Sequence, residues 1–530
     1  MADRDRRRPV WVAAAVAAAL AVAYLFAPPM GTDLSAQVAR AEFFAAHGTR
    51  PIDFSWYAGV NQYGYSLYTA ALQAALGVRV VGAVSAVVAA VGFAYLLVRV
   101  DARRPVLGAV LGAVVAVGNL VSGRTTFAVG QALGTLALVA LAAPRPARPV
   151  RLALAAVLAA LATWASPVAG LFLGLIGVAV LLALAPLGRL APAPSWRDAL
   201  PGLVLCVAAV VAVTPLAVVF GNGGRQPYSA ESMRINLALA VVVFVVVPGR
   251  YRAVRAGAVL TGLLLIAAYY LPSPIGSNAI RLPLLYALPV TAALAELSGA
   301  WLAALLAALL WWQPPVMVGD LTRVGSRETR AAFYRPLIEE LARRGPVGRV
   351  EVVPLRDHWE ARYVAATVPL ARGWERQADV DRNALFYSRT LRADAYGRWL
   401  RDGAVEYVAY APDSVPDMYA RQEAALVAGG LPYLREVWRD ATWRLYAVAD
   451  PAPLVAAPGR LVRSGAASVT FDVPSPGDVL IRVRYSRWLT LTGGGCPARG
   501  PDGWTLVRNA APGRHELSSS LSPAGCREPT

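Results

Sequence analysis

The chain of 530 residues contains no lysine, so all 51 of its Lys and Arg positions are arginine. Cysteine and histidine are also scarce, with three of each. The sequence has no C-x-x-C pair, no zinc-ligand spacing, no glycine-rich phosphate loop and no Ser/His/Asp arrangement, so none of the chemistries that these motifs support is indicated. Arginine in place of lysine, together with abundant alanine, valine and glycine, is typical of a GC-rich genome.

Acidic residues are few as well, 33 in all, which leaves a formal net charge of +18. A basic excess can indicate nucleic-acid binding. Here the arginines are spread over loops that flank apolar runs, which favours orientation in a membrane and predicts no nucleic-acid partner. The length and the hydrophobic content of 57% exclude a single soluble domain, and the lipid bilayer is the first expected partner.

Most charged residues lie after Trp312, and apolar runs dominate before it. No charged side chain lies well inside any run, which argues against an ion-coupled transporter. Several runs are shorter than the roughly 20 residues of a straight span. We predict a polytopic α-helical membrane protein of about eleven spans, with an uncleaved first span. The runs lie near 10–27, 80–98, 105–121, 126–142, 152–167, 168–187, 199–219, 235–247, 256–271, 282–296 and 299–313.

The arginines lie mainly in alternate loops, which predicts the orientation. They cluster in the N-terminal segment and in the loops near 99–104, 145–151, 189–197 and 250–255, and such loops face the cytoplasm. We therefore predict a multi-pass plasma-membrane protein with a cytoplasmic N-terminus. The loop 31–77 and everything after Pro314 are then extracytoplasmic.

Past Pro314 the composition changes, and three domains are predicted. Residues 1–315 form the transmembrane domain, with a large first external loop at 28–78. Residues 316–453 alternate helical and strand patterns, which predicts an extracytoplasmic α/β domain. Residues 454–530 hold short alternating runs between Gly and Pro turns, which predicts a β-sandwich-like domain.

Two of the three cysteines, Cys496 and Cys526, fall in this terminal domain. An extracytoplasmic compartment is oxidising, so we expect them to form a disulfide, the alternative being two free thiols. Cys206 lies inside a span and is expected to be core packing.

The loop 31–77 is far longer than a connection between two spans requires, and long loops of this kind are usually functional. Its pattern predicts a helix that opens at Asp33 and ends at His47, with Asp33, Gln37 and Arg40 on one face. An irregular aromatic segment follows from Pro51 to Gly64. Its rings suit an interface or a sugar-stacking surface.

This order of an acid after the first span, an amphipathic helix, His47-Gly48, Pro51, then Trp-Tyr-x-Gly and Tyr-Ser-Leu-Tyr, resembles the first external loop of the GT-C membrane glycosyltransferases. It is similar to the actinobacterial arabinosyl and mannosyl transferases of that superfamily. The resemblance implies a GT-C-like fold and a polyprenyl-phosphate sugar donor. It also implies that Asp33 is the catalytic acid residue of the loop. Leu34 follows Asp33 where many relatives have a second acid, and relatives often carry Lys-Pro-Pro where this chain has Gly64-Tyr65-Ser66.

As an inverting transferase the protein needs a base for the acceptor hydroxyl and cations for the leaving phosphate. Asp33 is the predicted base, with Asp53 as second choice; the alternative for Asp33 is a helix cap. Arg281, with Asn278 beside it in a late external loop, is the predicted phosphate ligand, although an interfacial arginine that reaches lipid headgroups is an equal alternative. Further substrate-binding candidates are Arg124, Arg225, Gln37, Arg40, Trp56 and Tyr57.

The sequence therefore predicts an enzyme that transfers a sugar from polyprenyl phosphate to a cell-envelope acceptor, a glycan or a lipid-linked molecule, on the outer face. The sequence identifies no cofactor with certainty, and a divalent cation is left open. The alternative is a non-catalytic transporter or cell-envelope assembly factor with a GT-C-like fold. The missing second acid after Asp33 favours that alternative.

Overall fold

The computed structural model describes residues 3–185 and 195–522, which divide into two compact units. The helical unit comprises Met1–Gln37, Tyr63–Gly221 and Arg225–Val324. The mixed unit comprises Val38–Gln62, Asn222–Gly224 and Gly325–Thr530. This division differs from the predicted domains in two respects: the helical unit extends to residue 324, and residues 38–62 of the long first loop belong with the C-terminal residues.

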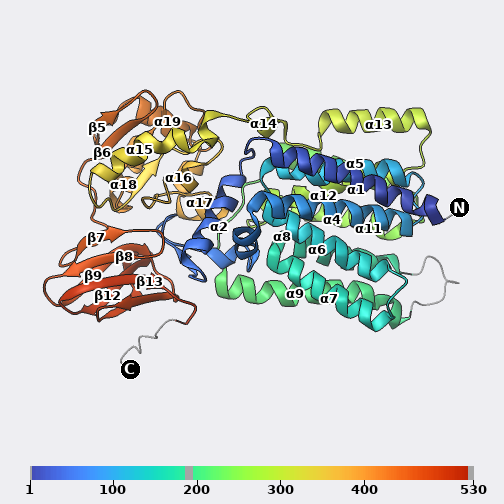
Figure 1. Ribbon diagram of the computed structural model, residues 1–530, viewed down its shortest axis with the longest axis horizontal. Coiled ribbons are helices and arrows are strands. Elements are labelled where there is room, and N and C mark those ends of the chain that lie inside the picture. Colours follow the sequence, from blue (N-terminus) through green and yellow to red (C-terminus); the bar gives the residue numbers. More distant parts are fainter. Residues whose placement is uncertain (1–2, 186–194, 523–530) are drawn as a thin grey trace. The chain divides into compact units, whose positions relative to one another are not determined.

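The helical unit is built from apolar helices, each on one of the predicted runs, which confirms the polytopic helical class (Figure 1). Seven are long and apolar enough to cross a membrane, and the total number of spans stays a prediction. The helices are α1 (Asp3–Phe26), α4 (Val78–Arg99), α5 (Pro105–Gly118), α6 (Thr125–Ala142), α7 (Arg148–Ala165), α8 (Pro167–Ala183), α9 (Trp196–Phe220), α10 (Ala230–Val246), α11 (Arg252–Tyr270), α12 (Arg281–Leu294) and α13 (Gly299–Trp312). Short helical elements are α3 (Thr69–Leu76), α14 (Val318–Leu321), η2 (Asn119–Ser122) and η3 (Gly276–Ile280).

Small side chains hold the helices together, while large apolar side chains face outward. Helix α1 packs on α4 and α5 through buried alanines such as Ala17, Ala86 and Ala113. Small residues let helix backbones approach closely, which is the usual basis of packing in a membrane. Val207 and Val211 of α9 are exposed, as expected for side chains that contact lipid.

Turn residues set where several helices begin. Pro105 and Pro167 stand in the first turn of α5 and α8, where the missing N–H is not needed. Helix α9 begins with a capping box, in which Ser195 Oγ accepts from the N–H of Arg197 at 3.1 Å and Asp198 accepts from the N–H of Ser195 at 3.1 Å.

The first part of the mixed unit is an α/β fold around a four-stranded sheet of order β3-β4-β6-β5. Strands β3 (Val350–Val352) and β4 (Tyr407–Tyr410) are parallel, and β5 (Leu434–Arg439) and β6 (Arg444–Val448) are antiparallel. The helical elements are η4 (Arg327–Thr329), α15 (Ala331–Arg343), α16 (Glu360–Tyr363), α17 (Arg376–Arg382), η5 (Ala384–Tyr387), α18 (Ala393–Asp402) and α19 (Arg421–Ala428). The chain leaves the helical conformation between η5 and α18, and β5 has too little apolar alternation to be predicted from sequence.

The predicted C-terminal β-sandwich is confirmed. One sheet has the order β10-β13-β8-β7 and the other β11-β12-β9. Alternate residues such as Phe471 and Ile481 are fully buried in the common core, which follows the period of two expected of strands with one buried face. The strands are β7 (Arg460–Ser464), β8 (Val469–Val473), β9 (Gly477–Arg484), β10 (Leu489–Thr492), β11 (Cys496–Arg499), β12 (Trp504–Ala510) and β13 (Gly513–Ser519), with η6 (Pro501–Gly503) before β12. Cys526 lies outside the described residues, so its bridge with Cys496 stays a prediction.

Residues 38–62 complete the mixed unit. Helix α2 (Leu34–His47) begins in the helical unit and continues into this segment. A short ribbon of β1 (Ile52–Asp53) and β2 (Val60–Asn61) follows, and η1 (Gln62–Gly64) closes it. The side chains of Ile52 and Phe54 are buried in the sandwich core, so a segment from the start of the chain finishes the core of its end.

Candidate active site

Two glycines set the position of Asp33. Gly31 has φ +95° and Gly123 has φ +78°, both in the left-handed region that favours glycine. A Cβ on Gly31 would overlap the backbone of Ser122, and a Cβ on Gly123 would overlap the backbone at the start of α2. The N–H of Asp33 donates to the Ser122 carbonyl at 3.1 Å. The loop before α2 is therefore packed directly against the turn before α6.

This packing brings Asp33 beside two of the predicted phosphate ligands. Asp33 Oδ2 lies 3.5 Å from Arg124 Nε and 4.0 Å from Arg281 Nη2. The Arg281 guanidinium carbon lies 5.0 Å from the centre of the Phe127 ring, so a cation–π contact also holds it. The Asp33 side chain keeps 26% of its surface exposed, so a substrate can still reach it. We call Asp33, Arg124 and Arg281 the Asp33 cluster.

Asn278 contributes to the cluster through its backbone. It lies in η3, and its carbonyl accepts from the N–H of Arg281, so η3 runs directly into α12 and presents Arg281. Arg225 is exposed, and within the described part of the chain it forms no ion pair. Its neighbour Gln226 donates to Ser277 Oγ at 3.1 Å, which attaches the segment around Arg225 to the loop before η3.

Gln37, a predicted substrate-binding residue, has its amide engaged in contacts with neighbouring side chains of the helical unit. Its side chain is buried, its Oε1 accepts from Thr126 Oγ1, and its Nε2 lies 3.2 Å from the Tyr65 hydroxyl. Because the amide is used on both sides, Gln37 fixes the first turn of α2 against α6. Thr126 and Tyr65 were not predicted as site residues, and a lone Thr or Tyr gives sequence reasoning no reason to select it.

The structure does not support a substrate role for Arg40, Trp56 or Tyr57. Arg40 is buried and ion-paired with Glu375 at 2.6 Å. Trp56 is fully buried and donates from Nε1 to the Ala361 carbonyl at 2.9 Å. The Tyr57 hydroxyl accepts from the N–H of Glu375 at 3.1 Å. Large rings gain most when they are buried, and here they join the core of the mixed unit instead of forming a sugar-stacking surface.

Asp53, the second choice for the base, is also enclosed. Its carboxylate accepts from the backbone N–H and the hydroxyl of Ser55. Burial raises the pKa of Asp53 to about 6, although the Ser55 hydrogen bonds oppose that shift. A carboxylate that is 3% exposed offers no access to an acceptor hydroxyl.

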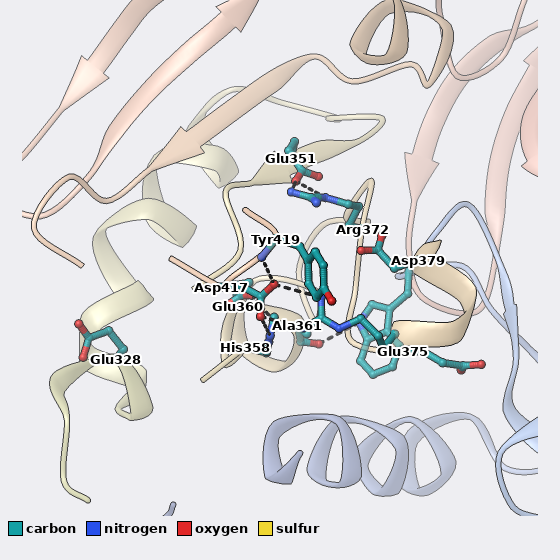
Figure 2. Close-up of polar contacts among 12 residues, drawn as sticks. Glu328, Glu351, His358, Glu360, Ala361, Arg372, Glu375, Asp379, Asp417 and Tyr419 are labelled. Atoms are coloured by element: carbon teal, nitrogen blue, oxygen red, sulfur yellow. Dashed lines mark hydrogen bonds and ion pairs between the residues drawn. The ribbon is translucent and has the colours of Figure 1, made fainter. Parts of the chain in front are cut away.

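A second polar network lies in the mixed unit and surrounds His358, which has φ +54° (Figure 2). The two ring nitrogens lie 3.3 Å from Glu360 and 3.3 Å from Asp417, and the ring stacks on Trp374. Burial favours the neutral ring, but the two carboxylates raise the pKa of His358 above its ordinary value. Burial likewise disfavours the Asp417 carboxylate, but Arg376 at 2.8 Å and His358 hold the pKa of Asp417 well below its usual range. Because His358 is 2% exposed, the network is structural.

An apolar cavity of about 320 Å³ lies in the helical unit beside the Asp33 cluster. Helices α4, α6, α8, α10, α11 and α12 line it, almost entirely with apolar side chains. Its wall includes Phe127, whose ring contacts Arg281, and Leu282, which follows Arg281 in α12. Phe127 therefore both lines the cavity and contacts Arg281 of the Asp33 cluster.

No family model and no curated protein matches the sequence. Solved structures do resemble the chain in fold. The cryo-EM structure of arabinofuranosyltransferase AftD from Mycobacteria has 15% sequence identity and a TM-score of 0.46 over 98% of this chain. This chain spans 58% of the length of that one. The crystal structure of the Archaeoglobus fulgidus oligosaccharyltransferase in the apo form has 11% identity and a TM-score of 0.45, covering 86% of this chain and 76% of that chain.

Proposed function

We propose that this protein is a membrane glycosyltransferase that moves a sugar from a polyprenyl-phosphate donor to a cell-envelope acceptor on the outer face of the plasma membrane. The observation that carries the proposal is the Asp33 cluster. A partly exposed carboxylate lies within 4.0 Å of two guanidiniums that come from different helices. The order of residues in the loop 31–77 supports the same assignment through its resemblance to the GT-C loop.

The cluster has the groups that an inverting transfer requires. Asp33 takes the proton of the acceptor hydroxyl as the acceptor oxygen forms its bond to the anomeric carbon. The bond from that carbon to the phosphate oxygen breaks at the opposite face of the sugar, and polyprenyl phosphate leaves. Arg124 and Arg281 stabilise the negative charge that develops on the phosphate, because guanidinium forms paired, charge-assisted hydrogen bonds with phosphate oxygens.

The apolar cavity suits the lipid part of such a donor. An isoprenoid chain has no polar groups to satisfy, and the cavity walls offer almost none. Phe127 lines the cavity and also contacts Arg281. An isoprenoid chain bound in the cavity would therefore have its phosphate group close to the Arg281 guanidinium. The cavity would then hold the isoprenoid tail of the donor, and the Asp33 cluster would hold its phosphate group.

The donor set does not fit a divalent cation. Mg²⁺ and Ca²⁺ need several oxygen ligands, usually with more than one carboxylate. Asp33 is instead accompanied by two cations, which repel a metal ion, and the described residues contain no group of three or more His, Cys, Asp or Glu suited to a metal. The arginines take the role of neutralising phosphate, so no step is assigned to a metal.

The proposal is tested by Asp33→Asn in cells that lack the wild-type copy, with cell-envelope glycan composition as the measurement. Asparagine keeps the shape but removes the base, so transfer should fall by roughly 10²–10⁴-fold. Asp198→Asn, at the start of α9, is the matched control and should leave the glycans unchanged. Wild-type glycans from a correctly inserted Asp33→Asn protein would sink the catalytic role.

One observation favours the alternative of a non-catalytic assembly factor. Asp33 already contacts Arg124 and Arg281, and its N–H is bonded to Ser122, so the cluster also resembles a structural clamp. A clamp predicts that Asp33→Asn lowers thermal stability, whereas a base predicts lost transfer with little change in stability. Thermal unfolding of the two purified proteins separates these outcomes.

A further inference from the structure

The mixed unit contains a group of arginines around β9 that is distinct from the Asp33 cluster. Arg482 and Arg484 alternate along β9 with the buried side chains of Ile481 and Val483, so both project from the outer face of the three-stranded sheet. The Arg484 guanidinium carbon lies 4.2 Å from the centre of the Trp504 ring on the neighbouring strand. Arg482 and Arg484 are both half-buried, which leaves part of each side chain open to solvent.

Two more arginines adjoin this face. Arg382 Nη1 donates to the Gly59 carbonyl at 2.6 Å, and the preceding carbonyl, of Ala58, accepts from the N–H of Arg484 at 2.7 Å. Arg349 is buried and donates from Nη2 to the carbonyl of Arg482 at 2.6 Å. We call Arg349, Arg382, Arg482 and Arg484 the β9 arginine group.

Among the described residues, no carboxylate lies within 4.0 Å of a guanidinium of the β9 arginine group. The nearby carboxylates are farther away: Glu375 and Asp381 attract Arg382, and Asp502 and Asp381 attract Arg484. The guanidinium N–H groups of Arg349 and Arg382 donate to neutral backbone carbonyls, and the buried Nε of Arg349 has no hydrogen-bond partner. Burial, followed by repulsion from Arg484 and Arg482, lowers the pKa of Arg349 to about 9.

Other buried arginines of the mixed unit are paired with carboxylates. Arg372 is ion-paired with Glu351 at 2.7 Å (Figure 2). Arg372 is also paired with Glu423, and Arg376 forms two hydrogen bonds with Asp417. A buried charge without a partner is strongly unfavourable, because desolvation is not offset by attraction. The β9 arginine group therefore lacks the close carboxylate partners that Arg372 and Arg376 have.

We propose that the β9 arginine group binds the phosphate group of a water-soluble phosphate ester, such as a sugar phosphate or a phosphate within a glycan. Guanidinium forks match phosphate oxygens in geometry and charge. A lipid source fits less well, because the described residues from 419 to 520 expose no large apolar side chain that could enter a membrane. The proposal does not depend on glycosyl transfer at Asp33.

The test is thermal unfolding of the purified full-length protein in detergent, titrated with inorganic phosphate and with glucose 1-phosphate. Binding to the native state alone raises the melting temperature with ligand concentration. Arg484→Gln should raise the half-saturating concentration by about tenfold or more, since a charge-assisted contact is lost. Arg514→Gln, on β13 and paired with Asp472 at 2.9 Å, is the matched control and should respond like the wild type.

Two further arms make the outcome unambiguous. Arg281→Ala should leave this response intact, because the Asp33 cluster is a separate site; loss in Arg281→Ala with retention in Arg484→Gln would overturn the proposal. If dioleoyl phosphatidylglycerol in mixed micelles stabilised the protein and glucose 1-phosphate did not, the proposal of a water-soluble ligand would be overturned.

Without phosphate, Arg484→Gln should be about as stable as the wild type, since the substitution relieves repulsion between arginines. A large loss of stability there would show a structural arginine and end the proposal.

Discussion

Arg281 is held by an aromatic ring and by a distant carboxylate, 4.0 Å away, rather than by a close ion pair. This leaves its donors available to a phosphate. We expect Arg281→Ala to weaken binding of a polyprenyl monophosphate by about tenfold or more, because a charge-assisted contact is lost. Arg281→Lys should recover only part, since an ammonium lacks the planar fork. Binding is measured with the full-length protein in detergent.

Arg255 provides a matched control for that measurement. Its guanidinium carbon lies 4.4 Å from the centre of the Phe244 ring, so Arg255→Ala removes the same kind of stack from the predicted cytoplasmic side of the same unit. Its affinity for the polyprenyl phosphate should stay at the wild-type value. An equal loss in both variants would mean that Arg281 acts through folding and not through contact with the phosphate.

At the scale of single residues, the sequence identified those whose role can be inferred from the residues next to them in the chain. Asp33, Arg124 and Arg281 were predicted, and the structure brings the three together. The burial of Trp56 and Tyr57 could not be predicted, because the same rings suit a sugar surface and a core, and only the tertiary fold decides which. The β9 arginine group could not be predicted, since its members come from positions 349 to 484 and meet only in the fold.

The segment around α16 carries a pH-dependent contact. His358 has a raised pKa because of Glu360 and Asp417, so its stabilising contribution is complete below its unfolded pKa, about 6.5, and is lost as pH rises through the folded value. Amide protection of residues 355–363, corrected for intrinsic exchange, should therefore fall as pH rises above about 6.5. His358→Gln should abolish this dependence, and His47→Gln should preserve it. An unchanged profile in His358→Gln would assign the effect to another group.

Element prediction succeeded where periodicity was long and failed where it was short. The apolar helices each stand on a predicted run, because 14 or more apolar residues have few alternatives to a helix. Helix α19 begins only at Arg421, because the segment before it is fixed by Asp417, which accepts from Arg376 and from the N–H of Tyr419. Such side-chain contacts cannot be seen in a periodic pattern.

The orientation of the whole molecule remains a prediction from the arginine asymmetry, and it can be tested directly. Ser388→Cys, in the mixed unit, and Ser195→Cys, before α9, both replace exposed residues. A membrane-impermeant thiol reagent should label Ser388→Cys on intact cells and Ser195→Cys only after permeabilisation. The reverse pattern would invert the topology and move the Asp33 cluster to the cytoplasmic side.

The contact between β1 and β13 imposes an order on biosynthesis. The N–H of Ile52 donates to Ser519 Oγ across a separation of 467 residues, and the Ile52 and Phe54 side chains lie in the sandwich core. At roughly 5–20 residues per second, the ribosome needs about 20–100 s to supply those partners. Ile52 and Phe54 must therefore wait for these partners until β13 has been translated. Nascent chains that stop before β13 cannot complete this core, and release of β13 from the ribosome is the step that allows it to close.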